Sequence, residues 1–191
     1  MNASAPGPRP PLSPRELQAA EAALGVTFPS AYREHLLHVS AGGHGRRGGG
    51  TMKPLHHGPA GWCWQGDTDT NLALLATPFP HPDSYRAQDE ALTDREPEES
   101  DFPDPAAFQV AWQAWDDECG ELEDHKTAGA VHLVEHGHNF RTLYVVTGPY
   151  RDTMWFDRRV TSDDIVPLRG PDGRIPTFAQ WYDWPEGWHG W

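Results

Sequence analysis

Apolar side chains recur at helical spacing in two short segments near the start of the chain, residues 12–24 and residues 29–39. In the first segment, Ser13 and Glu16 form the sequence pattern of a capping box, and Gly25 offers a C-terminal cap. The second segment begins at a proline and is closed by a pair of glycines. The pattern therefore predicts a pair of amphipathic helices.

A third helical pattern begins with Asp104 as the N-cap and a proline at the first helical position. Its aromatic side chains are four and three residues apart: Phe108, Trp112 and Trp115. We expect the helix to end at Gly120, and its tryptophans to lie in the core together with Trp155 and Trp181. Three carboxylates would then fall in its last turn, where the helix dipole makes negative charge unfavourable.

The pattern changes to strands after residue 130, where β-forming residues alternate with turn signals. The predicted strands are Val131 to Glu135, Thr142 to Thr147 and Met154 to Asp157, with a short edge strand at Ile165 to Leu168. The second strand is apolar on both faces, which indicates the centre of a sheet. A last helix is predicted from Thr177 to Trp184.

The order of several short motifs resembles the SUKH superfamily, whose domains are similar to the yeast cell-wall assembly regulator. The shared features are a helix that ends in Leu-Gly, a hydrophobic-Pro step, a Gly-Gly pair, a Thr-Gly-Pro turn, a Trp-containing strand and a Phe-containing final helix. In this chain they are Leu24-Gly25, Phe28-Pro29, Gly42-Gly43, Thr147-Gly148-Pro149, Met154-Trp155-Phe156-Asp157 and Phe178.

The resemblance implies a single α+β domain. Its antiparallel sheet of about four to six strands would be packed by the N-terminal helix pair, the middle helix and the C-terminal helix. Bacterial members of this superfamily are widely immunity proteins, which bind and neutralise a cognate toxin domain, often a nuclease. Eukaryotic relatives suggest the alternative of a regulatory scaffold that binds a cellular partner without neutralising a toxin.

The length of 191 residues fits one domain with a sizeable core, but 19 glycines and 19 prolines imply much loop. We divide the chain into a disordered Pro-rich tail (1–11), a SUKH-like domain (12–184) and a Trp/Gly tail (185–191). Within the domain, an acidic and Pro-rich insertion extends over about residues 78–103.

The excess negative charge is confined to one stretch. The chain has a net charge of −13, and residues 83–124 contain 15 acidic but only two basic residues, so the remainder is neutral. One interpretation is a solvated segment that maintains solubility, and the other is a docking surface for a basic partner. Direct binding of nucleic acid is disfavoured because this surface repels phosphates.

The resemblance and the charge together predict a protein partner, in the first place a toxin domain encoded nearby, with a basic nuclease as one possibility. Six carboxylates would oppose its lysines and arginines: Asp116, Asp117, Glu118, Glu121, Glu123 and Asp124. Trp62 and Trp64 lie in an irregular stretch and are candidates for aromatic anchors.

Two sequence patterns that are associated with cofactor binding or catalysis lie in secondary structure that does not suit these functions. Residues 43–48 match the dinucleotide-binding pattern GxGxxG, but they follow a helix rather than a strand. Residues 132–136 match the metalloprotease pattern HxxEH. On a strand, however, His132 and His136 would lie about 13 Å apart at ~3.3 Å per residue, too far to share one ion.

We therefore predict no enzyme activity, no cofactor and no metal site. A metal-dependent enzyme is the third alternative, with His136 and His138 joined by further ligands from Cys119, His125 or the pair His56-His57. No apolar stretch has the length of a membrane span or of a signal peptide, so we expect a cytoplasmic protein without membrane contact. The two cysteines are then expected to be reduced, and the oligomeric state stays open.

Overall fold

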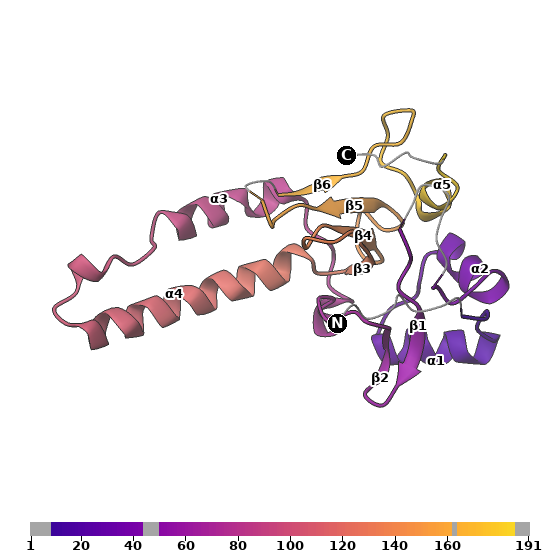
Figure 1. Ribbon diagram of the computed structural model, residues 1–191, viewed down its shortest axis with the longest axis horizontal. Coiled ribbons are helices and arrows are strands. Elements are labelled where there is room, and N and C mark those ends of the chain that lie inside the picture. Colours follow the sequence, from indigo (N-terminus) through magenta and orange to yellow (C-terminus); the bar gives the residue numbers. More distant parts are fainter. Residues whose placement is uncertain (1–8, 44–49, 162–163, 186–191) are drawn as a thin grey trace.

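A four-stranded antiparallel sheet organises the computed structural model, which describes residues 9–43, 50–161 and 164–185 (Figure 1). Its strands follow one another in the order β3-β4-β5-β6, with bounds Ala130–Glu135, Arg141–Val145, Met154–Asp157 and Ile165–Pro167. A second, two-stranded sheet consists of β1 (Leu55–Gly58) and β2 (Gly61–Trp64). The helices are α1 (Pro14–Leu24), α2 (Ser30–His38), α3 (Pro82–Thr93), α4 (Pro105–Lys126) and α5 (Phe178–Tyr182), with short 3-10 helices η1 (Leu72–Leu74) and η2 (Glu99–Asp101).

The two ends of α1 are fixed by the residues that the sequence indicates. The amide of Ser13 donates to Glu16 Oε2 at 2.8 Å, and the amide of Glu16 donates to Ser13 Oγ at 3.3 Å, which completes the capping box. Gly25 ends the helix in the left-handed conformation at a φ of 69°. The predicted helix pair is thus present, with α2 starting one residue after Pro29.

One face of the four-stranded sheet is covered by α1, α2, α5 and the β1–β2 hairpin. These elements form the main hydrophobic core, in which aromatic rings meet edge to face. Tyr32 is central, with ring centroids 5.3 Å from Phe28, 5.2 Å from Tyr144 and 5.0 Å from Phe178. Trp64 also lies in this core, and its indole N–H donates to the Tyr32 hydroxyl at 3.0 Å.

The opposite face of the sheet has a smaller core of its own. Leu143, Val145 and Trp155 lie on it because side chains alternate between the two faces of a strand. Loop residues cover them, including Phe79 before α3 and Tyr150 in the β4–β5 connection. Both faces are therefore buried, as the apolar sequence of β4 predicts.

The fold class is confirmed as α+β, and the four predicted C-terminal strands are present with ends shifted by one or two residues. The β1–β2 hairpin and helix α3 were not expected. The β1–β2 hairpin lies where the sequence showed no clear period, because its strands are only four residues long and contain glycines and histidines. Helix α3 forms within the acidic insertion, where Tyr85 and Leu92 pack on Leu122 of α4.

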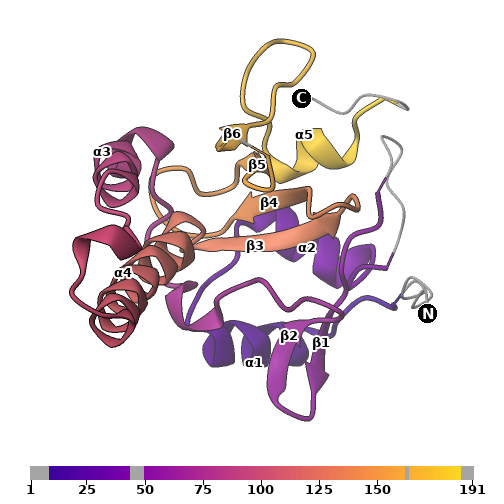
Figure 2. The same cartoon turned by 60° about the vertical axis from the view of Figure 1, so that its left-hand side comes forward.

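Helices α3 and α4 lie side by side and project from the sheet, as Figures 1 and 2 show. We call residues 82–126 the arm. Its small hydrophobic cluster is separate from the cores of the two sheet faces.

The described part of the predicted Pro-rich tail, residues 9–11, is hydrogen-bonded to the domain. The amide of Arg9 donates to the carbonyl of Gly42, and the amide of Ala41 donates to the carbonyl of Pro10. Residues 9–11 therefore follow the domain surface, and residues 1–8 and 186–191 lie outside the described residues. No helix in the described ranges is long and apolar enough to cross a bilayer.

Replacement of Gly129 by alanine tests how closely the segment before α3 packs on the joint between α4 and β3. Gly129 has a φ of +65°, and an added Cβ would overlap the Thr77 carbonyl oxygen and lie 2.9 Å from the Phe79 nitrogen. Gly66 has a similar φ of +76° but open space around it. We expect Gly66→Ala to lower the free energy of unfolding by about 1–2 kcal/mol. Gly129→Ala should cost about 1–3 kcal/mol more. Equal losses in urea denaturation would show that this packing is looser than described.

Candidate functional site

All six carboxylates that the sequence nominates for a partner lie on α4, and all are exposed. They extend from the middle of the helix to the end that joins the sheet: Asp116, Asp117, Glu118, Glu121, Glu123 and Asp124. The arm therefore presents most of the excess charge on one projecting element (Figure 1).

The predicted end of this helix at Gly120 is wrong, because α4 continues to Lys126. A glycine inside a helix costs about 1 kcal/mol relative to alanine. Here Leu122 packs on Tyr85 and Leu92 of α3, and this contact favours continuation. The carboxylates at 116–118 are thus mid-helix, and the expected conflict with the helix C-terminus does not arise there.

A row of aromatic rings follows the outer part of the arm. Neighbouring ring centroids are 5.9 Å, 5.9 Å and 5.0 Å apart in the order Phe102, Phe108, Trp112, Trp115. These side chains are half-buried, so the expectation that Trp112 and Trp115 belong to the central core is wrong, whereas Trp155 and Trp181 are buried as expected. The helical period was correct, but the neighbour that covers this face is α3 and its loop, and not the sheet. The exposed Val110 adds to the apolar surface of the arm.

The two tryptophans proposed as anchors lie away from the carboxylates. Trp64 is only 1% exposed and is fixed in the main core by its bond to Tyr32, so it is not available to a partner. Trp62 is half-buried on β2. This strand lies away from the outer part of the arm (Figure 1). The structure therefore brings the six carboxylates together with the arm aromatics rather than with Trp62.

Charged contacts hold the two helices of the arm to each other. The ammonium group of Lys126 is buried and donates to Asp89 Oδ1 of α3 at 2.7 Å and to Glu123 Oε1 at 2.6 Å. Burial alone would lower the pKa of Lys126, but the bonds to these two carboxylates raise it overall. Arg95 pairs with Glu118 at 2.8 Å nearer the tip of the arm.

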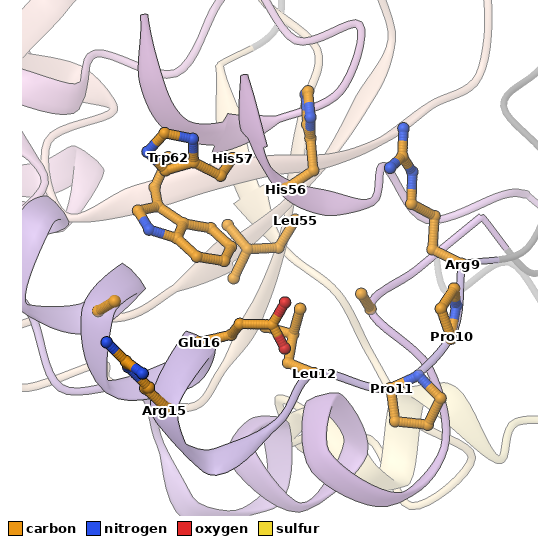
Figure 3. Close-up of a pocket in the computed structure, with 12 residues that line it drawn as sticks. Arg9, Pro10, Pro11, Leu12, Arg15, Glu16, Leu55, His56, His57 and Trp62 are labelled. Carbon is orange, nitrogen blue, oxygen red and sulfur yellow. The ribbon is translucent and has the colours of Figure 1, made fainter. Parts of the chain in front are cut away.

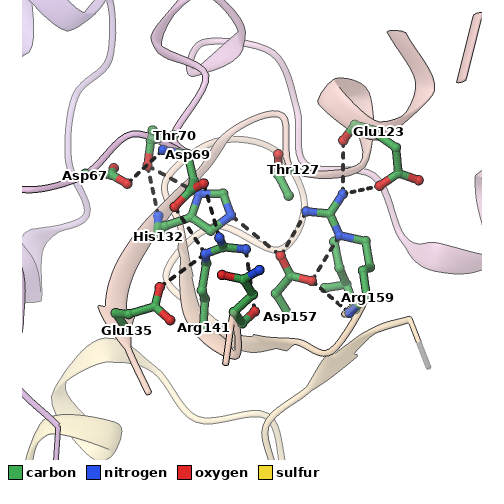
Figure 4. Close-up of polar contacts among 12 residues, drawn as sticks. Asp67, Asp69, Thr70, Glu123, Thr127, His132, Glu135, Arg141, Asp157 and Arg159 are labelled. Carbon is green, nitrogen blue, oxygen red and sulfur yellow. Dashed lines mark hydrogen bonds and ion pairs between the residues drawn. The ribbon is translucent and has the colours of Figure 1, made fainter. Parts of the chain in front are cut away.

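Arg159 connects the arm to the sheet (Figure 4). Its Nη1 donates to Glu123 Oε2 at 2.7 Å, and its Nη2 and Nε donate to the two oxygens of Asp157 at 2.8 Å and 2.9 Å. Asp157 is 1% exposed at the end of β5. One guanidinium group thus joins a buried carboxylate of the sheet to an exposed carboxylate of α4.

The network continues across three neighbouring strands near their ends. Arg141 of β4 lies opposite Glu135 of β3 on one side and Asp157 of β5 on the other. The register of β3 shifts between His132 and Val134, and this bulge leaves both Leu133 and Val134 in the main core. A regular strand would place His132 and Glu135 on opposite faces, whereas here both belong to the polar network of Figure 4.

The network surrounds a polar hollow of about 330 Å³ at the root of the arm. Four carboxylates and two guanidinium groups are among its lining residues: Asp69, Glu123, Asp124, Asp157, Arg141 and Arg159. The hollow therefore continues the negative surface of α4 onto the sheet.

The model of the SMI1 / KNR4 family (SUKH-1) matches residues 11–138. The chain belongs to this family. No curated protein and no solved structure matched the chain. The match begins just before α1 and ends in the β3–β4 connection, so the SMI1/KNR4 region includes the arm as well as the helix pair.

In this SMI1/KNR4 protein, Thr70, His132 and Asp157 stand in an order that is similar to a hydrolase triad. The hydroxyl of Thr70 accepts the backbone N–H of His132 at 3.0 Å and also contacts Asp67. The Nε2 atom of His132 lies 3.6 Å from Asp157 Oδ2, which is an electrostatic contact rather than a hydrogen bond. His132 is 2% exposed at the wall of the hollow, and the arrangement lacks the hydrogen bond between histidine and carboxylate that a triad requires.

The other sequence patterns for chemistry gain no geometric support. His132 lies on strand β3 and His136 directly follows its last residue, and each has a local partner: Asp157 for the first and the Thr142 hydroxyl for the second. Among the described residues, no three His, Cys, Asp or Glu side chains are close enough to hold one ion. The GxGxxG pattern lies almost wholly outside the described residues.

Sequence reasoning missed Arg159 and the arm aromatics as parts of this site. Arg159 is 36 residues from Glu123 along the chain, and no local pattern connects them. The nearest signal was Asp157 two residues before Arg159 at the end of a predicted strand.

The Asp157→Asn variant tests the connection between the arm and the sheet. Burial alone would raise the pKa of Asp157, but the contacts with His132 and Arg159 outweigh it and hold the pKa well below its ordinary range. We expect the variant to lose about 3 kcal/mol at neutral pH, the lower end for a broken buried pair, because Arg159 keeps Glu123.

The pH dependence follows from the lowered pKa. The stabilisation is fully present above the unfolded pKa of about 3.9 and is lost as the pH falls toward the native pKa. The difference between wild type and variant in urea denaturation should therefore shrink below about pH 4. A difference that is constant from pH 7 to pH 3 would contradict the ionised pair.

Proposed function

We propose that this protein is an immunity-type binding protein that neutralises a cognate toxin domain by occluding it, with the arm as the docking surface. Membership of the SMI1/KNR4 family supports a role in protein–protein interaction and not in catalysis. The observation that carries the proposal is the projecting arm, which combines six exposed carboxylates with a row of half-buried aromatic rings.

The chemistry of the arm selects a basic partner. A toxin domain that acts on nucleic acid needs a positive surface to approach phosphates. Carboxylates spread along α4 attract that surface at long range and accelerate association. The aromatic rings then supply desolvated anchors, which contribute most of the energy in many interfaces. A bound arm covers the surface that the toxin needs for its substrate.

The rigid base of the arm supports this mechanism. Lys126 joins α3 to α4, and Arg159 joins α4 to the sheet. An arm that is already held in position loses less conformational entropy when it binds. The proposed site of action is the cytoplasm.

A regulatory scaffold is the second candidate, and the same surface favours it. The arm would then bind a basic cellular protein without neutralising a toxin. Co-expression with the product of the adjacent gene separates the two roles. A toxic neighbour that is bound and neutralised supports immunity; binding without rescue supports the scaffold, and no binding by the neighbour contradicts the immunity role for that pair.

Reversal of the charge at Asp116, Asp117 and Glu118 to lysine tests the arm as the docking surface. We expect the association rate with the adjacent gene product to fall at least about tenfold at low salt, and its salt dependence to become weaker. Stopped-flow measurements at several salt concentrations provide both values.

The control places three lysines at exposed acidic positions outside the arm: Glu34, Asp172 and Asp183. It changes the net charge by the same amount, so a local effect leaves its association rate much closer to wild type. Equal rates for the arm variant and wild type would remove the arm from the mechanism.

A further inference from the structure

A groove of about 580 Å³ lies between the start of α1 and the β1–β2 hairpin (Figure 3). Both of these elements lie away from the outer part of the arm (Figure 1). Neither the family assignment nor the arm accounts for it.

The floor of the groove is apolar. Leu55 of β1 is fully buried beneath it, and Leu12 and Trp62 are half-buried at its sides. The ring of His57 meets Trp62 edge to face, with centroids 5.5 Å apart. An indole held in this way offers a flat apolar contact without the entropic cost of a mobile side chain.

The rim of the groove is basic, although the protein carries a net charge of −13. Arg9, Arg15 and His57 are exposed there, beside the half-buried His56. Arg9 donates from Nε and Nη2 to the side-chain oxygen of Gln65, at 3.1 Å and 2.7 Å. This neutral amide fixes the guanidinium group and leaves its charge uncompensated.

Arg15 occupies a position that its own helix disfavours. It lies in the first turn of α1, where the helix dipole already supplies partial positive charge. In the described ranges, neither Arg15 nor Arg9 has a carboxylate within ion-pair distance. Two positive groups at this rim therefore lack a counterion among the described residues.

The single carboxylate in the groove lining does not neutralise the rim. Glu16 accepts hydrogen bonds from the amide and the hydroxyl of Ser13, at 2.8 Å and 2.6 Å. These bonds complete the capping box and lower the pKa of Glu16. The negative charge of Glu16 therefore interacts with the N-terminus of α1.

The charges around His56 also make this rim positive. Burial lowers the pKa of His56, and the charges of Arg9 and His57 lower it further. The other polar group that faces the ring is Cys63, whose Sγ lies 3.7 Å from His56 Nε2. A negative group placed between the rim residues would oppose these charges.

We propose that this groove is a second docking surface, which binds an acidic peptide segment of a protein partner with an apolar side chain seated beside Trp62. The positive rim selects carboxylates, and the apolar floor selects the anchoring side chain. A polyphosphate chain is a poorer occupant because it has no apolar side chain to place beside Trp62. The protein thus carries two surfaces of opposite charge, and the groove functions independently of the arm.

The test uses a short synthetic peptide with a central leucine flanked by aspartates and glutamates. Its controls are the matched peptide with asparagines and glutamines, and a thymidine oligonucleotide. Binding of the labelled peptide is measured by anisotropy, and NMR follows the Trp62 indole and the His56 ring of the full chain. We expect shifts confined to the groove, and a His56 pKa that rises when the peptide is bound.

The double variant Arg9→Gln, Arg15→Gln should bind the acidic peptide about threefold to tenfold more weakly, as expected for two exposed ion pairs. The variant Arg33→Gln, Arg86→Gln changes the net charge equally at positions outside the groove, and it should bind like wild type.

Three results would overturn the proposal: no shifts at Trp62 and His56, tighter binding of the oligonucleotide, or equal losses in both double variants. None of these results depends on the arm or on a toxin, so they test the groove and leave the proposed function of the arm untouched.

Discussion

The guanidinium group of Arg159 is the contact on which the arrangement of the arm depends. It satisfies the buried carboxylate of Asp157 at the end of β5 and holds Glu123 at the root of α4. A buried carboxylate without such a partner would cost several kcal/mol, so the sheet and the arm require the same cation. Lys126 plays the corresponding part between α3 and α4. Two cations therefore place a strongly acidic element that has few apolar contacts with the sheet.

The two faces of the sheet have different roles in the fold. The helix pair, α5 and the hairpin complete the main core, in which Tyr32 and Trp64 are joined by a buried hydrogen bond. The other face has a smaller core that opens into the polar network at the strand ends. The bulge in β3 makes this change possible because it returns Glu135 to the side of His132. The family fold thus supplies a rigid scaffold, and its charged surfaces are added at opposite ends.

Features fixed by neighbours in the sequence could be predicted, and features fixed by distant contacts could not. The capping box of Ser13 and Glu16, the cap at Gly25 and the strand Met154–Asp157 depend on local chemistry. The exposure of the six carboxylates was also predictable, since charges are rarely buried unpaired. The continuation of α4 through Gly120 depends on α3, whose side chains Tyr85 and Leu92 pack on Leu122 of α4. Distant contacts also explain why Trp64 lies in the main core and Trp112 does not, contrary to expectation. Periodicity identifies the apolar face of an element but not the element that covers it.

The separate hydrophobic cluster of the arm has a consequence for how such a domain can diversify. Leu122, Tyr85 and Leu92 stabilise α3 and α4 without sharing a residue with the main core. Substitutions at sites that share no partners act additively on stability. Residues on the outer surface of α4 that make no contact with Arg159 can therefore change in charge and shape while the sheet keeps its stability. A lineage whose partner changes rapidly needs surface positions that can be substituted without loss of stability. In this fold, the separate packing of the arm provides such positions.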